Sequence, residues 1–112
     1  MVYNPIMNNY THRIILQLKN SFSALYGDRL RRVIVYGSQA RGDADQFSDI
    51  DVLVILRGPV QSSVEIARTG KIVADLSLQF DTVISCQFMD ENRYLNRNGP
   101  FLRNVRLEGV PV

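Results

Sequence analysis

The chain lacks the features that mark secreted, zinc-thiolate and membrane proteins. Among its 112 residues, Cys86 is the only cysteine and His12 the only histidine. A single cysteine allows no disulfide within the chain and no cysteine-rich zinc site. The sequence has no apolar run near the roughly 20 residues of a membrane span, and its first residues lack the basic and then apolar pattern of a signal peptide. We therefore expect a single soluble domain over residues 1–112, in the reducing cytoplasm, with no membrane partner.

The chain also lacks a large excess of charge of either sign. Thirteen lysines and arginines oppose eleven aspartates and glutamates, which leaves a net charge of +2 in a chain that is 46% apolar and 21% charged. This balance is too weakly basic to indicate nucleic-acid binding by itself. The chain also lacks a basic stripe with interleaved aromatic side chains, the pattern that follows a single strand of nucleic acid. We therefore do not expect a nucleic acid as the substrate.

The apolar residues follow the spacing of alternating helices and strands. The predicted elements are a helix over 8–26, a strand over 30–36, a helical turn over 38–42, a strand over 50–56, a helix over 60–80, a strand over 81–88 and a short helix over 101–107. The strand over 50–56 is almost entirely apolar, which is typical of a central strand covered on both faces. Gly70 marks a weak point in the second long helix, and residues 90–98 are predicted to form a polar loop. This order predicts an α/β (α+β) fold, in which helices pack on a small mixed β-sheet.

The first candidate binding residues lie in the segment VIVYGSQARGDADQFSDIDVLVIL over 33–56, where a strand ends at Gly37 and Ser38. A glycine lets the backbone approach a ligand closely, and the helical turn that follows presents free N–H groups to an anion. Ser38 adds a hydroxyl donor, and Arg41, one turn later, adds a charge suited to phosphate. Taken alone, the same residues also suit an ordinary strand-to-helix connection that Ser38 caps.

Two aspartates follow Ser38 after a spacer of ten residues. Asp49 and Asp51 flank the start of the most apolar strand, although aspartate is depleted in strands. Alternate residues of a strand share a face, so both carboxylates point the same way. Two like charges held together are costly, and a divalent cation such as Mg²⁺ relieves their repulsion while it also binds substrate phosphates. The alternative is a pair of ordinary strand-edge or turn carboxylates.

A third carboxylate is predicted from the next strand. Asp81 begins that strand and is expected to meet Asp49 and Asp51 from a neighbouring position in the sheet. Three carboxylates can hold two metal ions, and the third is the natural general base for an attacking hydroxyl group. Asp75 is the rival candidate, but it falls inside the predicted second helix, where a solvent-facing position is the simpler interpretation.

These motifs resemble a known family. Gly-Ser, ten residues and then Asp-x-Asp closely resemble the signature of the DNA polymerase beta-like nucleotidyltransferase superfamily. The stretches GSQARGDADQFSDIDVLVIL, FDTVIS and FLRNVRLEGV are similar to its minimal nucleotidyltransferase (MNT) branch, so the resemblance spans most of the chain. It implies a nucleotidyltransferase fold like the palm of polymerase beta, with ATP as co-substrate and Mg²⁺ in a two-metal site.

The resemblance also implies a role for each candidate residue. Gly37 and Ser38 would hold the triphosphate, Asp49 and Asp51 would bind metal, and Asp81 would complete the catalytic triad. The reaction implied is transfer of AMP with release of pyrophosphate.

The same resemblance implies an acceptor outside the chain. A core of this size lacks the extra domain with which larger relatives hold DNA, tRNA or an antibiotic. MNT proteins resemble antitoxins that are encoded beside an α-helical HEPN ribonuclease toxin, in type VII-like toxin–antitoxin pairs, and that transfer AMP to a toxin tyrosine. The chain is not itself the toxin, because no arginine precedes His12 at the spacing of the HEPN motif.

Three points about partners stay open. The chain is expected to form a homodimer or a hetero-oligomer with the toxin. It could instead be a small-molecule nucleotidyltransferase of the aminoglycoside type, acting as a homodimer, or a non-catalytic antitoxin that blocks its partner by occlusion. Finally, the C-terminal arginines form either a basic face toward an acidic partner or ordinary surface positions; they are Arg93, Arg97, Arg103 and Arg106.

Overall fold

Helices and strands alternate along the chain in the computed structural model, which describes residues 7–42 and 49–112. The helices are α1 (Asn9–Tyr26), the short 3-10 helix η1 (Gly27–Arg29), α2 (Ser38–Arg41), α3 (Ser62–Gln79), α4 (Glu91–Asn96) and α5 (Pro100–Glu108). The strands are β1 (Leu30–Tyr36), β2 (Ile50–Leu56), β3 (Ile84–Asp90) and β4 (Val110–Pro111). The strands predicted over 30–36 and 50–56 are confirmed at both ends. None of these helices is both long and apolar enough to cross a membrane.

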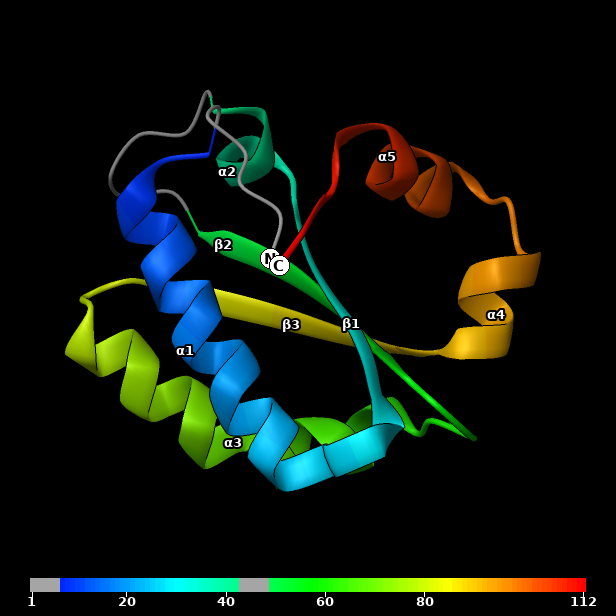
Figure 1. The fold of residues 1–112 in the computed structure, drawn as a ribbon, viewed down its shortest axis with the longest axis horizontal. Helices are drawn as coiled ribbons and strands as arrows, with labels where there is room; N and C mark the ends of the chain where they lie inside the picture. Colours follow the sequence, from blue (N-terminus) through cyan, green and yellow to red (C-terminus); the bar gives the residue numbers. More distant parts are fainter. Residues whose placement is uncertain (1–6, 43–48) are drawn as a thin grey trace.

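The central strand of the sheet is β2. The strand order is β3-β2-β1-β4, and β2 runs antiparallel to β1 but parallel to β3. The helix α3 makes the crossover that a parallel pair of strands requires (Figure 1). Every side chain of β2 except that of Asp51 is buried. The predicted mixed sheet with an apolar central strand is therefore confirmed.

Helices cover both faces of this sheet, because alternate strand residues point to opposite sides. The helices α1 and α3 lie on one face, while α4 and α5 lie on the other (Figure 1). The first face buries the larger core, which includes Phe22 of α1, Leu76 of α3 and Val52 of β2. The second core joins Leu53 of β2 to Leu102 of α5. Asp51 is two residues from Leu53, so it lies on the α5 side of the sheet.

The turn after α3 differs from the prediction. The strand that was expected to begin at Asp81 begins at Ile84 instead. The N–H of Thr82 donates to the carbonyl of Ser77 at 3.0 Å, and the N–H of Asp81 donates to that of Leu78 at 3.4 Å. These two bonds form a Schellman motif, the common C-terminal cap of a helix, with Asp81 in its left-handed position at a φ of 48°. The strand prediction at Asp81 is wrong because this cap consumes the residues that were expected to begin β3.

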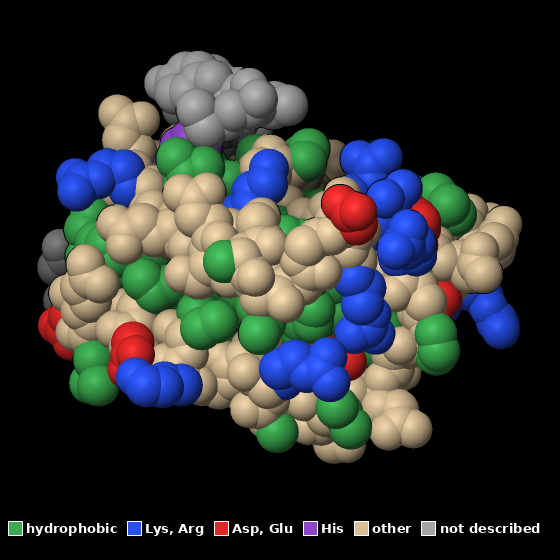
Figure 2. Space-filling model, turned by 60° about the horizontal axis from the view of Figure 1, so that its bottom comes forward, with side chains coloured by type: hydrophobic (Ala, Val, Ile, Leu, Met, Phe, Trp, Pro, Cys, Tyr) green, Lys and Arg blue, Asp and Glu red, His purple; other side chains and the backbone are tan. Residues whose placement is uncertain are grey.

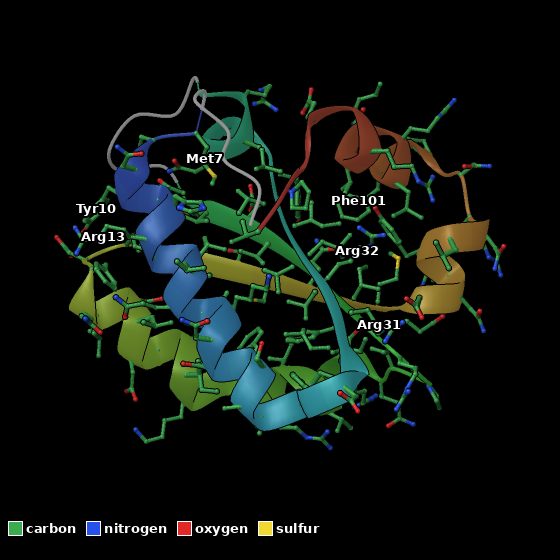
Figure 3. The ribbon with its side chains drawn as sticks, in the orientation of Figure 1. Met7, Tyr10, Arg13, Arg31, Arg32 and Phe101 are labelled. Carbon is green, nitrogen blue, oxygen red and sulfur yellow. The ribbon has the colours of Figure 1, made fainter. Side chains whose placement is uncertain are left out.

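The same turn is fastened to the start of α1. The Tyr10 hydroxyl donates to the carbonyl of Phe80 at 2.8 Å. The two rings also meet edge to face, with 5.8 Å between their centroids. Figure 3 shows Tyr10 at the outer edge of α1, beside the turn that leads out of α3. The turn therefore has a defined position, set by contacts from both helices.

Two further elements differ from the prediction. Residues 90–98, predicted as a polar loop, contain α4. This helix forms because the Asp90 carboxylate accepts the N–H of Arg93 at 2.8 Å and so caps the first turn. The strand β4 is only two residues long, too short for a periodic signal in the sequence. Gly70 lies inside α3 and does not break it.

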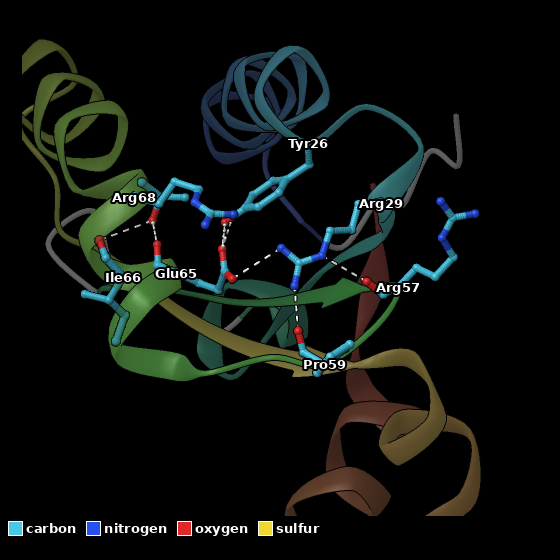
Figure 4. A network of polar contacts seen from close by, with 8 residues as sticks. Tyr26, Arg29, Arg57, Pro59, Glu65, Ile66 and Arg68 are labelled. Atoms are coloured by element: carbon cyan, nitrogen blue, oxygen red, sulfur yellow. Dashed lines mark hydrogen bonds and ion pairs between the residues drawn. The ribbon is translucent and has the colours of Figure 1, made fainter.

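A buried polar network joins the C-terminal end of β2 to the helices on one face of the sheet (Figure 4). Glu65 of α3 is only 3% exposed. Its carboxylate accepts the Tyr26 hydroxyl at 2.7 Å and pairs with the guanidinium groups of Arg29 at 3.3 Å and Arg68 at 3.4 Å. The network therefore joins the end of α1, the 3-10 helix and the start of α3.

Candidate active site

Asp51 lies in a row of side chains that crosses three strands. Its register partners are Tyr36 in β1 and Ser85 in β3. Tyr36 is half-buried and packs edge-on against Phe101 of α5, with 5.3 Å between ring centroids, whereas Ser85 is exposed. Asp49 precedes β2 by one residue and is exposed. The aspartate pair therefore opens to solvent at the start of β2, beside the exposed side chain of β3.

The carboxylates of Asp49 and Asp51 repel one another. Burial raises the pKa of the Asp51 carboxyl, and the nearby charge of Asp49 raises it further. Burial also raises the pKa of Tyr36, with contributions from Asp51 and Cys86. Both shifts mean that added negative charge is unfavourable here unless a cation balances it. Two adjacent carboxylates, one partly open to solvent, suit a Mg²⁺ ion that is shared with phosphate oxygens.

Gly37 lies directly against the Asp51 carboxylate. Its backbone has a φ of 75°, and a Cβ atom built on it would lie 2.7 Å from Oδ2 of Asp51. No larger residue fits without moving that carboxylate, so the glycine is required by a close approach as well as by its dihedral angle. The structure thus brings together the Gly-Ser turn and the aspartate pair, which ten residues separate in the sequence.

We expect Gly37→Ala to weaken binding of ATP with Mg²⁺ by at least about tenfold, equivalent to about 1.4 kcal/mol. The reason is that the new methyl group displaces the Asp51 carboxylate. Gly58→Ala is the matched control, because Gly58 also has a positive φ of 86° but its Cβ would meet nothing within 4 Å. Both variants should lose about 1–3 kcal/mol of stability from backbone strain, and isothermal calorimetry should show the binding defect only at Gly37. Equal ATP affinity in the two variants would contradict a role of Gly37 in binding the triphosphate.

Ser38 and Arg41 lie on the short helix α2 that follows. Ser38 opens the helix and is half-buried. The exposed Arg41 side chain pairs with Glu108 of α5 at 3.0 Å. An exposed ion pair of this kind is worth about 0–1 kcal/mol, so loss of the pair with Glu108 is by itself a small cost when a phosphate takes the place of that carboxylate. α2 is itself held in place by Gln39, whose buried amide oxygen accepts the Thr11 hydroxyl at 2.9 Å.

The structure does not bring Asp81 to the other two aspartates. Asp81 is exposed in the turn after α3, and the described residues contain no group of three His, Cys, Asp or Glu side chains that could hold a metal. The β3 residue beside Asp51 is Ser85, a neutral hydroxyl. The predicted triad is therefore reduced, within the described residues, to the pair Asp49 and Asp51.

We expect Asp81→Gly to raise the free energy of unfolding by about 0.5–1 kcal/mol, because glycine adopts a left-handed conformation without the steric cost of a side chain. Urea unfolding measures this change. Asp81→Asn is the matched control: asparagine tolerates the same conformation, so its stability should stay near that of the unmodified protein. Both variants should bind Mg²⁺ and ATP normally. A loss of Mg²⁺ affinity in Asp81→Asn would restore the residue to the metal site.

Tyr36 and Ser85 are the site residues that sequence reasoning missed. Tyr36 precedes Gly37 and has no motif of its own. Ser85 was predictable as a residue on one face of its strand, but not as the neighbour of Asp51, because that depends on the register between β2 and β3. No local signal contains this register.

The sequence matches a protein family over most of its length. The model of the family described as the nucleotidyltransferase domain matches residues 15–110. Two proteins of Methanocaldococcus jannaschii, each named "Putative protein adenylyltransferase", are similar to this chain. One is 40% identical over 72 residues, which are 64% of this chain and 72% of the relative. The other is 30% identical over 98 residues, which are 87% of this chain and 92% of the relative.

Solved structures resemble the fold. A toxin–antitoxin complex crystallised with AMP-PNP contains a chain that superposes with a TM-score of 0.59 and 19% sequence identity, covering 90% of this chain and 70% of that one. At this level of identity the similarity establishes a shared fold.

Proposed function

Because this chain is a nucleotidyltransferase, a member of the nucleotidyltransferase domain family, we propose that it transfers AMP from ATP to a hydroxyl group of another protein. The acceptor we propose is a tyrosine of a HEPN-type toxin, which the chain neutralises as the antitoxin of a type VII-like pair. The observation that carries the proposal is the contact between Gly37 and Asp51 beside Asp49. It supports a site in which a turn suited to phosphate and a pair suited to metal act together at one end of the sheet.

Similarity to other proteins supports the choice of AMP and of a protein acceptor. The Methanocaldococcus relatives are named for adenylyl transfer to protein, and one of them aligns over nearly its whole length. The superposed toxin–antitoxin complex was crystallised with AMP-PNP, an analogue of ATP, and it supports a toxin as partner. The tyrosine and the HEPN class of the toxin come from the MNT resemblance of the sequence motifs.

The residues of the site have separate tasks in this proposal. Gly37 has no side chain, so the triphosphate can come close to the backbone there. Ser38 offers its hydroxyl and N–H groups to phosphate oxygens. Arg41 exchanges Glu108 for a phosphate oxygen. The acceptor hydroxyl then releases its proton to the solvent at which the aspartate pair opens, and its oxygen bonds to the α-phosphorus as the bond to the departing pyrophosphate breaks. Positioning of the two reactants supplies most of what the protein must contribute to this reaction.

Asp49 and Asp51 would hold Mg²⁺, which when bound neutralises phosphate charge and stabilises the leaving pyrophosphate. The chemistry of the donor set fits this ion, since one or two carboxylates with substrate phosphates are its usual ligands. The described residues offer two carboxylates rather than three. We therefore propose one Mg²⁺ held by this chain with the triphosphate, in place of the two-metal site expected from the sequence.

The proposal is tested by incubating the protein with ATP, Mg²⁺ and the α-helical protein encoded beside it, followed by intact-mass analysis. We expect the partner to gain the mass of AMP, and peptide mapping to place it on a tyrosine. Tight binding without a change in mass would overturn catalysis in favour of occlusion. Transfer of AMP to an aminoglycoside but not to the partner would overturn the protein acceptor.

A further inference from the structure

A cavity of about 540 Å³ lies between α4 and α5, on the same side of the sheet as Asp51. Its floor is apolar and its rim is polar. The lining residues used below are Met89, Arg93, Arg97, Asn98, Phe101 and Leu102. We propose that this cavity binds an acidic segment of the protein acceptor and so selects which protein receives AMP. This inference rests on the proposed function, because it needs a protein acceptor.

The first argument is the charge of the rim. Arg93 and Arg97 are exposed, and within the described residues neither side chain forms an ion pair or a hydrogen bond. The nearby glutamates are already engaged, since Glu91 pairs with Arg31 at 3.0 Å and Glu108 pairs with Arg41. Figure 2 shows Lys and Arg side chains, with some Asp and Glu among them, toward the right of the view, the side on which α4 lies in Figure 1. The rim therefore offers two guanidinium groups with no acidic partner of their own.

The second argument is the combination of donors with an apolar floor. A guanidinium group binds a carboxylate through two parallel hydrogen bonds, and the Asn98 amide can add another. Met89 and Phe101 provide a half-buried apolar surface beneath them. A short peptide with adjacent carboxylates and one apolar side chain matches all these features. An extended nucleic acid does not, because phosphates that continued along α4 would meet the carboxylate of Asp90.

The third argument is the connection to the active site. Phe101 lines the cavity and packs against Tyr36, the register partner of Asp51. Along β3, Ser85 is the neighbour of Asp51 and Met89 lies four residues further on. At the rise of an extended strand, this spacing is about 13 Å. The side chain of Ser85 is exposed, and so is that of Gln87, which lies between Ser85 and Met89. An acceptor held by its acidic segment in the cavity can therefore reach Asp51 with a hydroxyl group about four extended residues away.

Binding is tested without catalysis, using synthetic peptides and ¹⁵N-labelled protein. We expect Tyr-Gly-Gly-Gly-Leu-Asp-Glu to shift the backbone amide signals of Met89, of residues 93–99 and of residues 101–102. The peptide Tyr-Gly-Gly-Gly-Leu-Lys-Lys and an oligouridylate should leave these signals unchanged. No shift with the acidic peptide, or equal shifts with the oligouridylate, would overturn the inference.

Selection is tested with the double variant Arg93→Glu, Arg97→Glu. For a protein acceptor we expect its KM to rise by about tenfold or more, because charge reversal at two contacts opposes the acidic segment. The affinity for ATP should not change. The matched control is Arg13→Glu with Lys71→Glu, which makes the same change in net charge at exposed positions on α1 and α3. It should leave the KM of the acceptor near that of the unmodified protein.

The outcomes separate this inference from the proposed function. If the unmodified protein modifies its partner and the double variant does so with the same KM, the cavity is not the acceptor site although AMP transfer stands. If the acidic peptide binds at the cavity but no protein is ever modified, the cavity binds acidic segments and the proposed transfer fails. An equal rise in KM for the double variant and its control would mean that net charge alone causes the effect. It would overturn a specific site in the cavity.

Discussion

Asp51→Asn should abolish AMP transfer, with kcat/KM at least about a thousandfold lower, a loss of about 4 kcal/mol of transition-state stabilisation. The asparagine keeps the shape of the side chain but removes the charge that would hold Mg²⁺ beside the triphosphate. Asp49→Asn should have a comparable effect, because the two carboxylates act on the same ion. The measurement is the rate of AMP incorporation into the partner protein, with Mg²⁺ affinity followed separately by calorimetry.

The fold should survive this change. The raised pKa of Asp51 means that the folded protein holds the proton more tightly than the unfolded chain does. Without a divalent cation, this residue therefore lowers stability as the pH rises above its unfolded pKa of about 3.9. Asp51→Asn removes that penalty, so at neutral pH its free energy of unfolding should equal or exceed that of the metal-free unmodified protein.

Asp75→Asn is the matched control for the lost charge. Asp75 is exposed on α3 and pairs only with Lys71 among the residues described, at 2.8 Å. Its replacement should leave activity unchanged. Full activity in the double variant Asp49→Asn, Asp51→Asn would refute the metal site, and a loss in Asp75→Asn would move the role to α3.

The second large effect concerns stability. Glu65→Ala should lower the free energy of unfolding by about 3 kcal/mol, because it breaks a buried pair from one side. The Tyr26 hydroxyl would lose its acceptor in a buried position. Arg29 would keep its bonds to the carbonyl oxygens of Arg57 at 2.9 Å and Pro59 at 2.7 Å. Chemical unfolding followed by circular dichroism measures the difference.

Two variants calibrate this prediction. Tyr26→Phe removes only the hydroxyl and should cost about 1–2 kcal/mol. Asp75→Ala removes an exposed carboxylate from the same helix and should cost less than about 1 kcal/mol. If Glu65→Ala is no more destabilising than Asp75→Ala, the network does not hold α1 and α3 together.

The network should also affect how the free energy of unfolding depends on pH above about 10. Burial raises the pKa of the Tyr26 hydroxyl, and its hydrogen bond to Glu65 and the charge of that carboxylate raise it further. A raised folded-state pKa means that the contribution of Tyr26 is complete below the ordinary tyrosine value of about 10 and is lost as the pH rises above it. Tyr26→Phe should remove this part of the pH dependence.

Local patterns in the sequence were sufficient for the two strands that flank the site. The apolar runs of β1 and β2 are rich in β-branched residues, and the ends of both strands were predicted correctly. That Asp49 and Asp51 share one face, which the two-residue period of a strand predicts, stays a prediction, because Asp49 lies just before β2. The turn at Asp81 was not predictable in the same way. A glycine or asparagine usually occupies the left-handed position of a helix cap, and an aspartate there carries no such signal.

The sequence by itself therefore determined the residues of the candidate site: a Gly-Ser turn, an aspartate pair and the strand that carries them, all within about 20 consecutive residues. Only the tertiary structure decided which residues surround that chemistry. The contact of Gly37 with Asp51, the place of Ser85 beside that aspartate and the cavity between α4 and α5 all join segments that are distant in the chain. Strand register and helix packing set such contacts, and both follow from burial of the whole core rather than from any local preference.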